Sequence, residues 1–209
     1  SNKHIVLGNT GFIGKNLEKY LIQKRKSVCG FNSKQINLFY KKSSLKLSKF
    51  INKETIIFFL SFNKNQSKAS IKDFDKNYLL IKNFIDVIKK KKPKKIIFFS
   101  SQSVYGEDTH NLNITENTIP NPTSYYGIAK YTAERLLIKF CYEKKISLIV
   151  IRIPRVYGLG DNPRNYGPTK FIDFFKKKKQ LIVWGSGDEK RDYLYINDLN
   201  KIIVKLSMI

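Results

Sequence analysis

Short apolar runs alternate along the chain with stretches in which apolar residues recur every three or four positions. The fully apolar runs occupy residues 56–60, 96–99 and 148–151, and similar runs stand at residues 4–7 and 27–31. Runs of this kind are typical of strands that are buried on both faces of a parallel sheet. Helical spacing occurs between them at residues 13–21, 78–88 and 129–141. The alternation predicts an α/β fold with a doubly wound parallel sheet.

A glycine-rich loop joins the first predicted strand to the first predicted helix, with the sequence Gly8-Asn9-Thr10-Gly11-Phe12-Ile13-Gly14. Glycines allow the backbone to turn tightly and to approach a pyrophosphate closely, and the helix N-terminus offers free N–H groups to the phosphates. The spacing is G-x-x-G-x-x-G rather than G-x-G-x-x-G. The loop predicts a dinucleotide site, and a turn that only connects a strand to a helix is the alternative interpretation.

Hydroxyl side chains stand near the ends of two later elements. Ser101 and Ser103 follow the strand at residues 96–99, at the carboxyl edge of the sheet, where such sheets bind ligands. Tyr126 and Lys130 are four positions apart and share a helix face, so that the ammonium group lowers the pKa of the phenol toward neutrality. A tyrosine of that kind is suited to acid/base catalysis. A surface tyrosine beside a solvated lysine is the other interpretation of the same spacing.

The chain is strongly basic, with 40 Lys and Arg against 16 Asp and Glu and a formal net charge of +24. Most of the basic residues are lysines, spread along the chain and often placed at the ends of predicted helices, where they suit the helix dipole. We interpret this charge as solvated surface. We therefore expect no specific nucleic-acid partner, only a weak, salt-sensitive attraction to polyanions.

Neither a membrane segment nor a metal site is expected. No run reaches the ~20 apolar residues needed to span a bilayer, and the first strand begins too early for a signal peptide. Cys29 and Cys141 lie on different apolar segments and form no metal-type cluster, as expected of reduced core residues. The sequence predicts a cytoplasmic protein without a metal.

Five segments, in order, resemble the extended short-chain dehydrogenase/reductases, in particular the NAD-dependent epimerase/dehydratase branch that acts on nucleotide sugars. They are the glycine loop and residues 100–106, 115–130, 183–187 and 191–198. The resemblance implies a Rossmann-like domain over residues 1–165. It also implies a small, incomplete C-terminal substrate-binding lobe, with returning sheet elements, over residues 166–209. A homodimer formed through the helices at residues 75–90 and 126–142 is implied as well.

The resemblance assigns roles to individual residues. Tyr126 is the acid/base, Lys130 lowers its pKa and bonds the nicotinamide ribose, and Ser101 binds the reacting sugar oxygen. Substrate contacts are implied for Ser103, Arg155 and Arg191, the last as a partner of the diphosphate. Cofactor contacts are implied for Gly8, Asn9, Thr10, Gly11, Phe12, Ile13, Gly14, Leu60, Ser61, Asn77, Tyr126, Lys130 and Pro154.

The residues after the second strand bear on the choice between NAD and NADP. NAD-specific sites usually carry an acidic residue there, which binds the ribose 2′-OH. Here Asn32, Ser33 and Lys34 occupy the position, and no Asp or Glu occurs between Glu18 and Glu54. These side chains tolerate a 2′-phosphate, so the sequence favours NADP slightly over NAD. In the alternative, Lys34 points to water and Asn32 accepts the ribose hydroxyls, which leaves NAD usable.

Departures from the family pattern narrow the reaction. Gln102 and Ser103 stand where dehydratases have an Asp-Glu pair, Ser103 and Gly160 stand where fucose-synthase-like members have Cys and His, and Arg155 replaces an Asn. The reaction expected is that of a nucleotide-sugar 4-epimerase or 4-keto reductase, with hydride transfer at C4. The alternatives are a catalytically inactive NAD(P)-binding regulatory protein and, less favoured, a basic nucleic-acid-associated protein.

Overall fold

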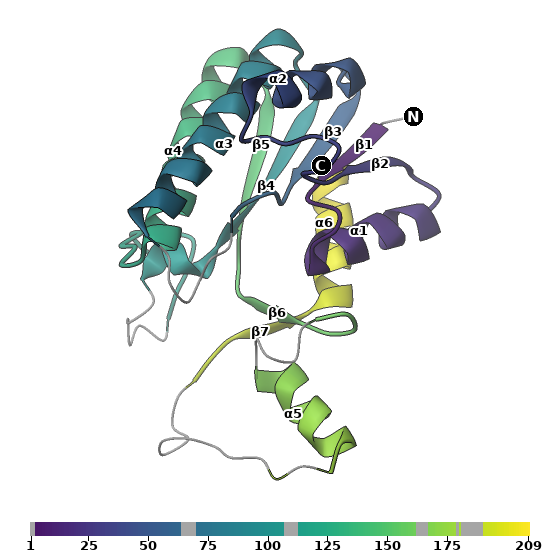
Figure 1. Ribbon diagram of the computed structural model, residues 1–209, viewed down its shortest axis with the longest axis vertical. Coiled ribbons are helices and arrows are strands. Elements are labelled where there is room, and N and C mark those ends of the chain that lie inside the picture. The colour runs from purple at the N-terminus through teal and green to yellow at the C-terminus, as the bar shows by residue number, and fades with distance from the viewer. Residues whose placement is uncertain (1–2, 64–69, 107–112, 162–166, 179, 181–189) are drawn as a thin grey trace. The chain divides into compact units, whose positions relative to one another are not determined.

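A computed structural model describes the chain except for residues 1–2, 64–69, 107–112, 162–166, 179 and 181–189 (Figure 1). The chain forms two compact units, Ser1–Ile153 and Pro154–Ile209. The domain boundary expected from the sequence, between residues 165 and 166, stays a prediction. In the structure, the strand that follows Pro154 pairs with a strand near the C-terminus.

The first unit is built on a five-stranded parallel sheet. Its strands are β1 (Lys3–Leu7), β2 (Ser27–Phe31), β3 (Thr55–Phe59), β4 (Lys95–Ser101) and β5 (Ser147–Ile153), in the order β2-β1-β3-β4-β5. The chain runs outward from β1 to β2 and then returns to β3 on the other side of β1, so the winding reverses between β1 and β3. This arrangement confirms the prediction of a doubly wound, Rossmann-like sheet.

Helices cover both faces of this sheet. One face carries α1 (Phe12–Gln23), and the other carries α3 (Ile71–Lys90) and α4 (Tyr125–Lys144), which lie side by side (Figure 1). Short elements complete the unit: α2 (Lys41–Ser44) and the 3₁₀ helices η1 (Leu45–Phe50) and η2 (Gln102–Tyr105). Every residue of β3 is buried, as expected for a strand covered on both faces.

The main core lies between the sheet and the pair α3 and α4. Phe59 of β3 stacks on Phe84 of α3 with ring centres 4.3 Å apart, and Phe98 of β4 packs against Phe59 at 5.6 Å. All three rings are fully buried. This layer fixes α4 against the carboxyl half of β4, and that contact positions the candidate site.

The second unit contains β6 (Arg155–Tyr157), α5 (Gly167–Lys176), β7 (Tyr193–Tyr195) and α6 (Ile196–Met208). The strands β6 and β7 form a two-stranded parallel sheet, in which Arg155 pairs with Tyr193. β7 is the strand that the structure describes within residues 166–209, the segment for which returning sheet elements are expected. The assignment of this unit to substrate binding stays a prediction.

The expectations about a membrane segment and a metal site can be compared with the described residues. None of the helices there is both long and apolar enough to cross a bilayer. The described residues also contain no group of three or more His, Cys, Asp or Glu side chains that could hold a metal. Cys29 and Cys141 are free, and burial raises the pKa of the Cys141 thiol to about 11.

Candidate functional site

The glycine loop lies where the winding of the sheet reverses, next to the chain that leaves β3. Gly8 has a φ of +93°, a conformation that favours glycine, and a Cβ there would lie 3.1 Å from the backbone nitrogen of Ser61. A Cβ at Gly14 would collide with the carbonyl oxygen of Gly8. Both positions therefore need glycine to keep the turn tight, and the turn lies close to Leu60 and Ser61. The contact of these two residues with a cofactor stays a prediction.

The loop leads directly into the N-terminus of α1. Gly11 is the N-cap and has no side chain to bond the first-turn N–H groups of the helix. The first N–H groups of a helix have no partner within the helix, so those of Phe12 and Ile13 are available to an anion. The tight turn and the uncapped helix fit a dinucleotide pyrophosphate at this position.

The turn after β2 is closed by its own side chains. The Asn32 carboxamide oxygen accepts hydrogen bonds from the backbone N–H groups of Lys34 (2.9 Å) and Gln35 (3.2 Å). The side chains of Ser33 and Lys34 are exposed. Asn32 is therefore already engaged as an acceptor, and the two N–H groups that it holds are withdrawn from any phosphate.

An acidic side chain reaches β2 from α1. A Cβ at Gly30 would collide with the Glu18 carboxylate and with the Asn9 side chain, so both of these groups lie against the strand. The Asn9 carboxamide donates to Glu18 over 3.0 Å. The Asn9 carboxamide oxygen is buried and has no hydrogen-bond partner among the described residues. This carboxylate was not predicted, because Glu18 precedes β2 in the chain and stands on a helix.

Asn77 holds the loop that follows β3. Its carboxamide oxygen accepts from the backbone N–H of Asn63 (2.8 Å), and its nitrogen donates to the Asn63 carbonyl (3.2 Å). The Asn63 side chain donates to Asp73 over 3.0 Å, and hydrogen bonds from Ser70 lower the pKa of Asp73. Asn77 is 2% exposed. These contacts give it a structural role in fixing the loop, and direct contact with a cofactor stays a prediction.

Tyr126 and Lys130 are brought together on α4. The N-cap Ser124 accepts from the N–H of Gly127, and a Cβ at Gly127 would collide with the Ser103 carbonyl, so the first turn of α4 packs directly on η2. Lys130 is 3% exposed, and its ammonium group donates to the Phe99 carbonyl over 2.7 Å. The Lys130 nitrogen lies 5.8 Å from the centre of the Tyr126 ring.

The two serines at the end of β4 bond to each other. The Ser101 hydroxyl donates to that of Ser103 over 3.1 Å and accepts from the Ser103 backbone N–H over 3.2 Å. Ser101 is half-buried, whereas Ser103 is 8% exposed. Of the two, Ser101 is the more accessible, in keeping with the role predicted for it.

Phe62 is a neighbour of the pair that sequence reasoning missed. The Lys130 nitrogen lies 3.9 Å from the centre of the Phe62 ring. The Phe62 and Tyr126 rings are 6.0 Å apart and nearly perpendicular, at 87°. The available signal was the sequence Leu60-Ser61-Phe62, which stands where the family usually has L-A-A and so places a large ring at a small-residue position.

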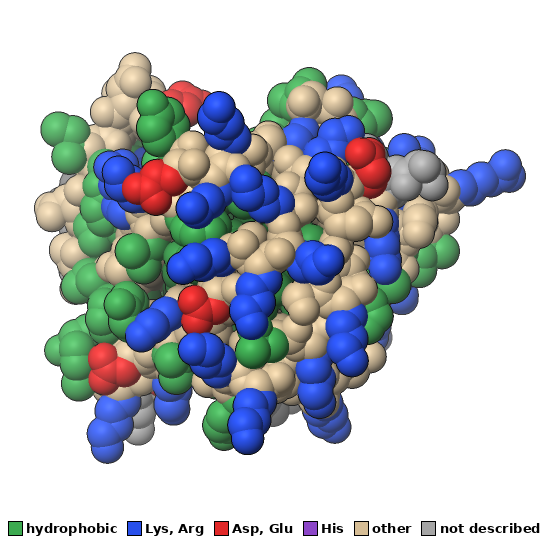
Figure 2. Space-filling model, turned by 90° about the horizontal axis from the view of Figure 1, so that it is seen from above, with side chains coloured by type: hydrophobic (Ala, Val, Ile, Leu, Met, Phe, Trp, Pro, Cys, Tyr) green, Lys and Arg blue, Asp and Glu red, His purple; other side chains and the backbone are tan. Residues whose placement is uncertain are grey.

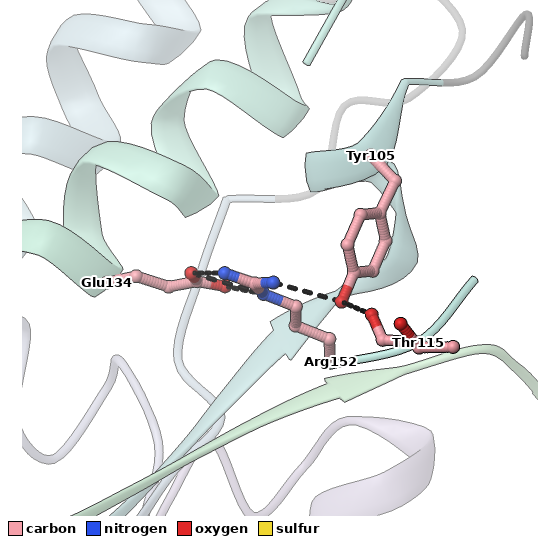
Figure 3. A network of polar contacts seen from close by, with 4 residues as sticks. All are labelled: Tyr105, Thr115, Glu134 and Arg152. Atoms are coloured by element: carbon pink, nitrogen blue, oxygen red, sulfur yellow. Dashed lines mark hydrogen bonds and ion pairs between the residues drawn. The ribbon is translucent and has the colours of Figure 1, made fainter. Parts of the chain in front are cut away.

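A polar network, also missed, joins α4 to the end of β5 and to η2 (Figure 3). Arg152 bonds the Glu134 carboxylate through Nε (3.1 Å) and Nη2 (2.8 Å), and donates from Nη1 to the Tyr105 hydroxyl over 2.9 Å. The Tyr105 hydroxyl in turn donates to the Thr115 carbonyl over 3.3 Å. Glu134 is fully buried, and its hydrogen bonds raise the pKa of Arg152. Glu134 stands one helical turn beyond Lys130, which is the spacing that could have pointed to it.

The remaining predicted residues belong to the second unit. Pro154 precedes β6, Arg155 lies in β6, and Arg191 is exposed ahead of β7. Their contacts with cofactor or substrate stay predictions. The segment at residues 183–187, which contributed to the family resemblance, lies outside the described residues.

The sequence of the chain is similar to those of known proteins along nearly its whole length. A sequence model of the NAD dependent epimerase/dehydratase family matches residues 4–207. The chain is 31% identical to dTDP-D-glucose 4,6-dehydratase of Dictyostelium discoideum over 94% of its own length and 53% of the relative's. It is 29% identical to GDP-6-deoxy-D-talose 4-dehydrogenase of Aggregatibacter actinomycetemcomitans, over 98% of this chain and 69% of that one.

The fold of the chain is also similar to that of a solved nucleotide-sugar epimerase. The UDP-glucose 4-epimerase of Thermotoga maritima, solved with UDP-glucose, superposes with a TM-score of 0.80 at 25% identity, covering 95% of this chain and 71% of that one. The present chain spans about half the length of the Dictyostelium dehydratase. With the family model matching nearly all of it, the chain belongs to the NAD dependent epimerase/dehydratase family.

Proposed function

We propose that the protein is an NAD(P)-dependent nucleotide-sugar 4-epimerase or 4-keto reductase, with Tyr126 as the acid/base at the sugar C4 hydroxyl. The observation that carries the proposal is the buried Lys130 ammonium group, held 5.8 Å from the Tyr126 ring at the carboxyl end of the sheet. The three relatives described above all carry chemistry at position 4 of a nucleotide-linked sugar in their names.

The residues of the first unit divide the work among themselves. The nicotinamide, when bound, accepts a hydride from the sugar carbon or donates one to it. The N–H groups of the glycine loop and of α1 bind the pyrophosphate. Lys130 favours the phenolate of Tyr126 and bonds the nicotinamide ribose, Tyr126 moves the hydroxyl proton, and Ser101 orients the sugar oxygen. Ser103 of this unit is proposed as a substrate contact, as are Arg155 and Arg191 of the second unit.

The residues after β4 favour epimerisation or reduction over dehydration. Elimination of water from the sugar requires an acid and a base close to the reacting carbons. Gln102 and Ser103 stand where the dehydratases of the family have an Asp-Glu pair, and neither of them titrates near neutral pH. We therefore do not propose for this chain the dehydration that the name of its Dictyostelium relative describes.

For the cofactor, the geometry shifts the balance from NADP, which the sequence alone favours, to NAD. The unpartnered Asn9 oxygen and the Glu18 carboxylate beside Gly30 are acceptors, which suit the two donating hydroxyls of a ribose. A 2′-phosphate brings further acceptors and negative charge. The donors near it include the exposed Ser33 and Lys34 side chains, whereas the backbone N–H groups of Lys34 and Gln35 are already bonded to Asn32.

Titration of the protein with NAD and with NADP at fixed ionic strength tests this choice. We expect NAD to bind about tenfold more tightly, because one charge-assisted contact is worth roughly 1.5–3 kcal/mol. Glu18→Gln should narrow the difference between the affinities for NAD and NADP. The double variant Ser33→Ala with Lys34→Ala serves as the matched control. Tighter binding of NADP that is lost in the double variant would overturn the choice.

Two further properties are part of the proposal. The exposed apolar residues Tyr78, Leu79, Ile128 and Ile138 on α3 and α4 support a homodimer formed through these helices. We also propose a cytoplasmic location. On the face seen in Figure 2 the Lys and Arg side chains are spread over the whole surface, with other side chains between most of them, and form no single stripe. This distribution favours a solvated surface over a nucleic-acid interface there.

A screen of UDP-, GDP- and dTDP-linked sugars, with products identified by NMR, tests the function. We expect one nucleotide sugar to be converted at C4 in the presence of cofactor, and conversion to be lost in Tyr126→Phe. Tight cofactor binding without turnover of any nucleotide sugar would favour the alternative, an inactive NAD(P)-binding regulatory protein.

A further inference from the structure

We propose that Phe62 is a positioning residue for the Tyr126–Lys130 pair: the face of its ring holds the Lys130 ammonium group beside Tyr126. The inference rests on the proposed function, in which this pair moves the sugar proton. Phe62 itself has no group that can transfer a proton, so it acts through its two neighbours.

The ammonium group of Lys130 lies over the Phe62 ring. The nitrogen is 3.9 Å from the Phe62 ring centre, against 5.1 Å for Phe98 and 5.8 Å for Tyr126. A buried ammonium group must recover the hydration that it loses. Phe62 contributes through cation–π attraction, and the Phe99 carbonyl contributes through its 2.7 Å hydrogen bond. Both contacts help to keep the charge of Lys130 in the site.

The same ring also contacts Tyr126. The two rings are nearly perpendicular with centres 6.0 Å apart, an arrangement that aromatic pairs favour. Phe62 packs in addition on Phe98 of the core, at 6.4 Å. One ring therefore touches both members of the pair, and its orientation decides how far the ammonium group stands from the phenol.

The position of Phe62 is itself fixed by its neighbour in the chain. Asn63 is held at its backbone by Asn77 and at its side chain by Asp73, both of α3. On the other side, the backbone of Ser61 lies against Gly8 of the glycine loop. The segment that presents the ring is thus anchored at both ends by residues of the described structure.

Other titratable and charged groups on the surrounding elements affect how the Tyr126 titration and kcat depend on pH. They include Asp73 of α3, Lys95 of β4, Tyr105 of η2, Arg152 of β5 and Glu134 of α4 itself. Glu134, Arg152 and Tyr105 are bonded to one another, and Asp73 is bonded to Ser70 and Asn63. Lys95 stands at the start of β4, at the opposite end of the strand from Ser101. Substituting Phe62 leaves these partners in place.

Substitutions of Phe62 separate its ring face from its volume. Phe62→Tyr keeps the face, whereas Phe62→Leu, with Phe62→Met as a second variant if Leu fails to fold, keeps apolar volume without it. Tyr126 is titrated by ultraviolet absorbance as the difference between each protein and the same protein carrying Tyr126→Phe. Affinity for NAD, kcat and KM are measured alongside.

We expect Phe62→Leu to raise the apparent pKa of Tyr126 by about one unit, the size of a partly desolvated cation–π contact. At neutral pH, kcat should fall about tenfold with little change in KM, and Phe62→Tyr should restore most of both properties. The inference would be overturned if the Phe62→Leu and Phe62→Met variants had the same Tyr126 titration and the same kcat as the unsubstituted protein. A shifted Tyr126 titration without turnover of any nucleotide sugar would support the role of Phe62 while contradicting the proposed function.

Discussion

At the scale of single residues, the proposed chemistry depends on one oxygen atom, the phenol of Tyr126. Tyr126→Phe removes that oxygen and leaves the ring that packs at right angles to Phe62. We expect NAD affinity to change little and kcat to fall by about 10²–10⁴-fold, the usual contribution of a positioned acid/base. Tyr142→Phe, at an 84% exposed position on the same helix, is the control and should have no effect. Undiminished turnover in Tyr126→Phe would remove this residue from the mechanism.

Lys130 is expected to behave differently from Tyr126, because its ammonium group serves both cofactor and tyrosine. Lys130→Met keeps most of the buried stem and loses the charge that lies 3.9 Å from the Phe62 ring. We expect weaker NAD binding in calorimetry and, in rate measurements at saturating cofactor, a lower kcat that recovers partly at high pH. A change in NAD affinity alone would show that Lys130 does not act on Tyr126.

His4 gives the first unit a pH-dependent stability. Burial lowers the pKa of His4 below its ordinary value of 6.5, and its ring lies against Phe58, with Nδ1 3.1 Å from the Ser27 carbonyl oxygen. Between the lowered and the ordinary pKa, the unfolded chain binds a proton that the folded chain does not. The free energy of unfolding should therefore fall as the pH is lowered through 6.5, and fall less in His4→Gln. Denaturant unfolding at pH 7.5 and pH 5.5 measures the difference, and equal pH dependence in both proteins would contradict it.

At the scale of elements, the Arg152–Glu134 pair holds α4 to the end of β5 (Figure 3). Glu134→Gln leaves a guanidinium group largely buried without its counter-charge, and loss of one partner of a buried pair typically costs about 3–5 kcal/mol. We expect a loss of this order in the free energy of unfolding. The control is Lys139→Met, which breaks an exposed pair with Glu143 at 3.1 Å on the same helix and should cost less than about 1 kcal/mol. Equal losses in the two variants would show that the buried network adds no stability.

At the scale of the whole molecule, the dimer proposal predicts a concentration-dependent mass. Sedimentation equilibrium at micromolar concentration should give twice the chain mass of 24.4 kDa. Leu79→Glu with Ile138→Glu places charges on α3 and α4 and should give monomers. Ile22→Glu, at a 59% exposed position of α1 on the other face of the sheet, should leave the dimer intact. A monomeric mass for the unsubstituted protein would contradict the proposal.

The pattern of the chain predicted the sheet because its central strands β1, β3 and β4 are largely buried, which leaves apolar runs such as residues 56–60. The edge strands β2 and β5 are only half-buried. It predicted the Tyr126–Lys130 pair because one helix places the two residues together. It could not predict that Phe62 covers Lys130, because that contact joins elements that are distant in sequence. Nor could it predict that Glu18 reaches β2, because that contact depends on a side-chain direction set only after α1 has packed on the sheet. The pairing of β6 with β7 likewise joins strands far apart in the chain.

In the proposed reaction, Tyr126 and Lys130 move a proton while hydride passes between C4 of a nucleotide sugar and the nicotinamide. It is tested with the C4-hydroxyl sugar of the substrate–product pair found in the screen, which carries deuterium at C4 and is supplied with NAD while the label is followed by NMR. We expect deuterium to appear on the nicotinamide, or to return to C4 with inverted configuration, and we expect this transfer to be lost in Tyr126→Phe. Deuterium that stays at an unaltered C4 while NAD is bound, or label transfer at an undiminished rate in Tyr126→Phe, would contradict the proposed reaction.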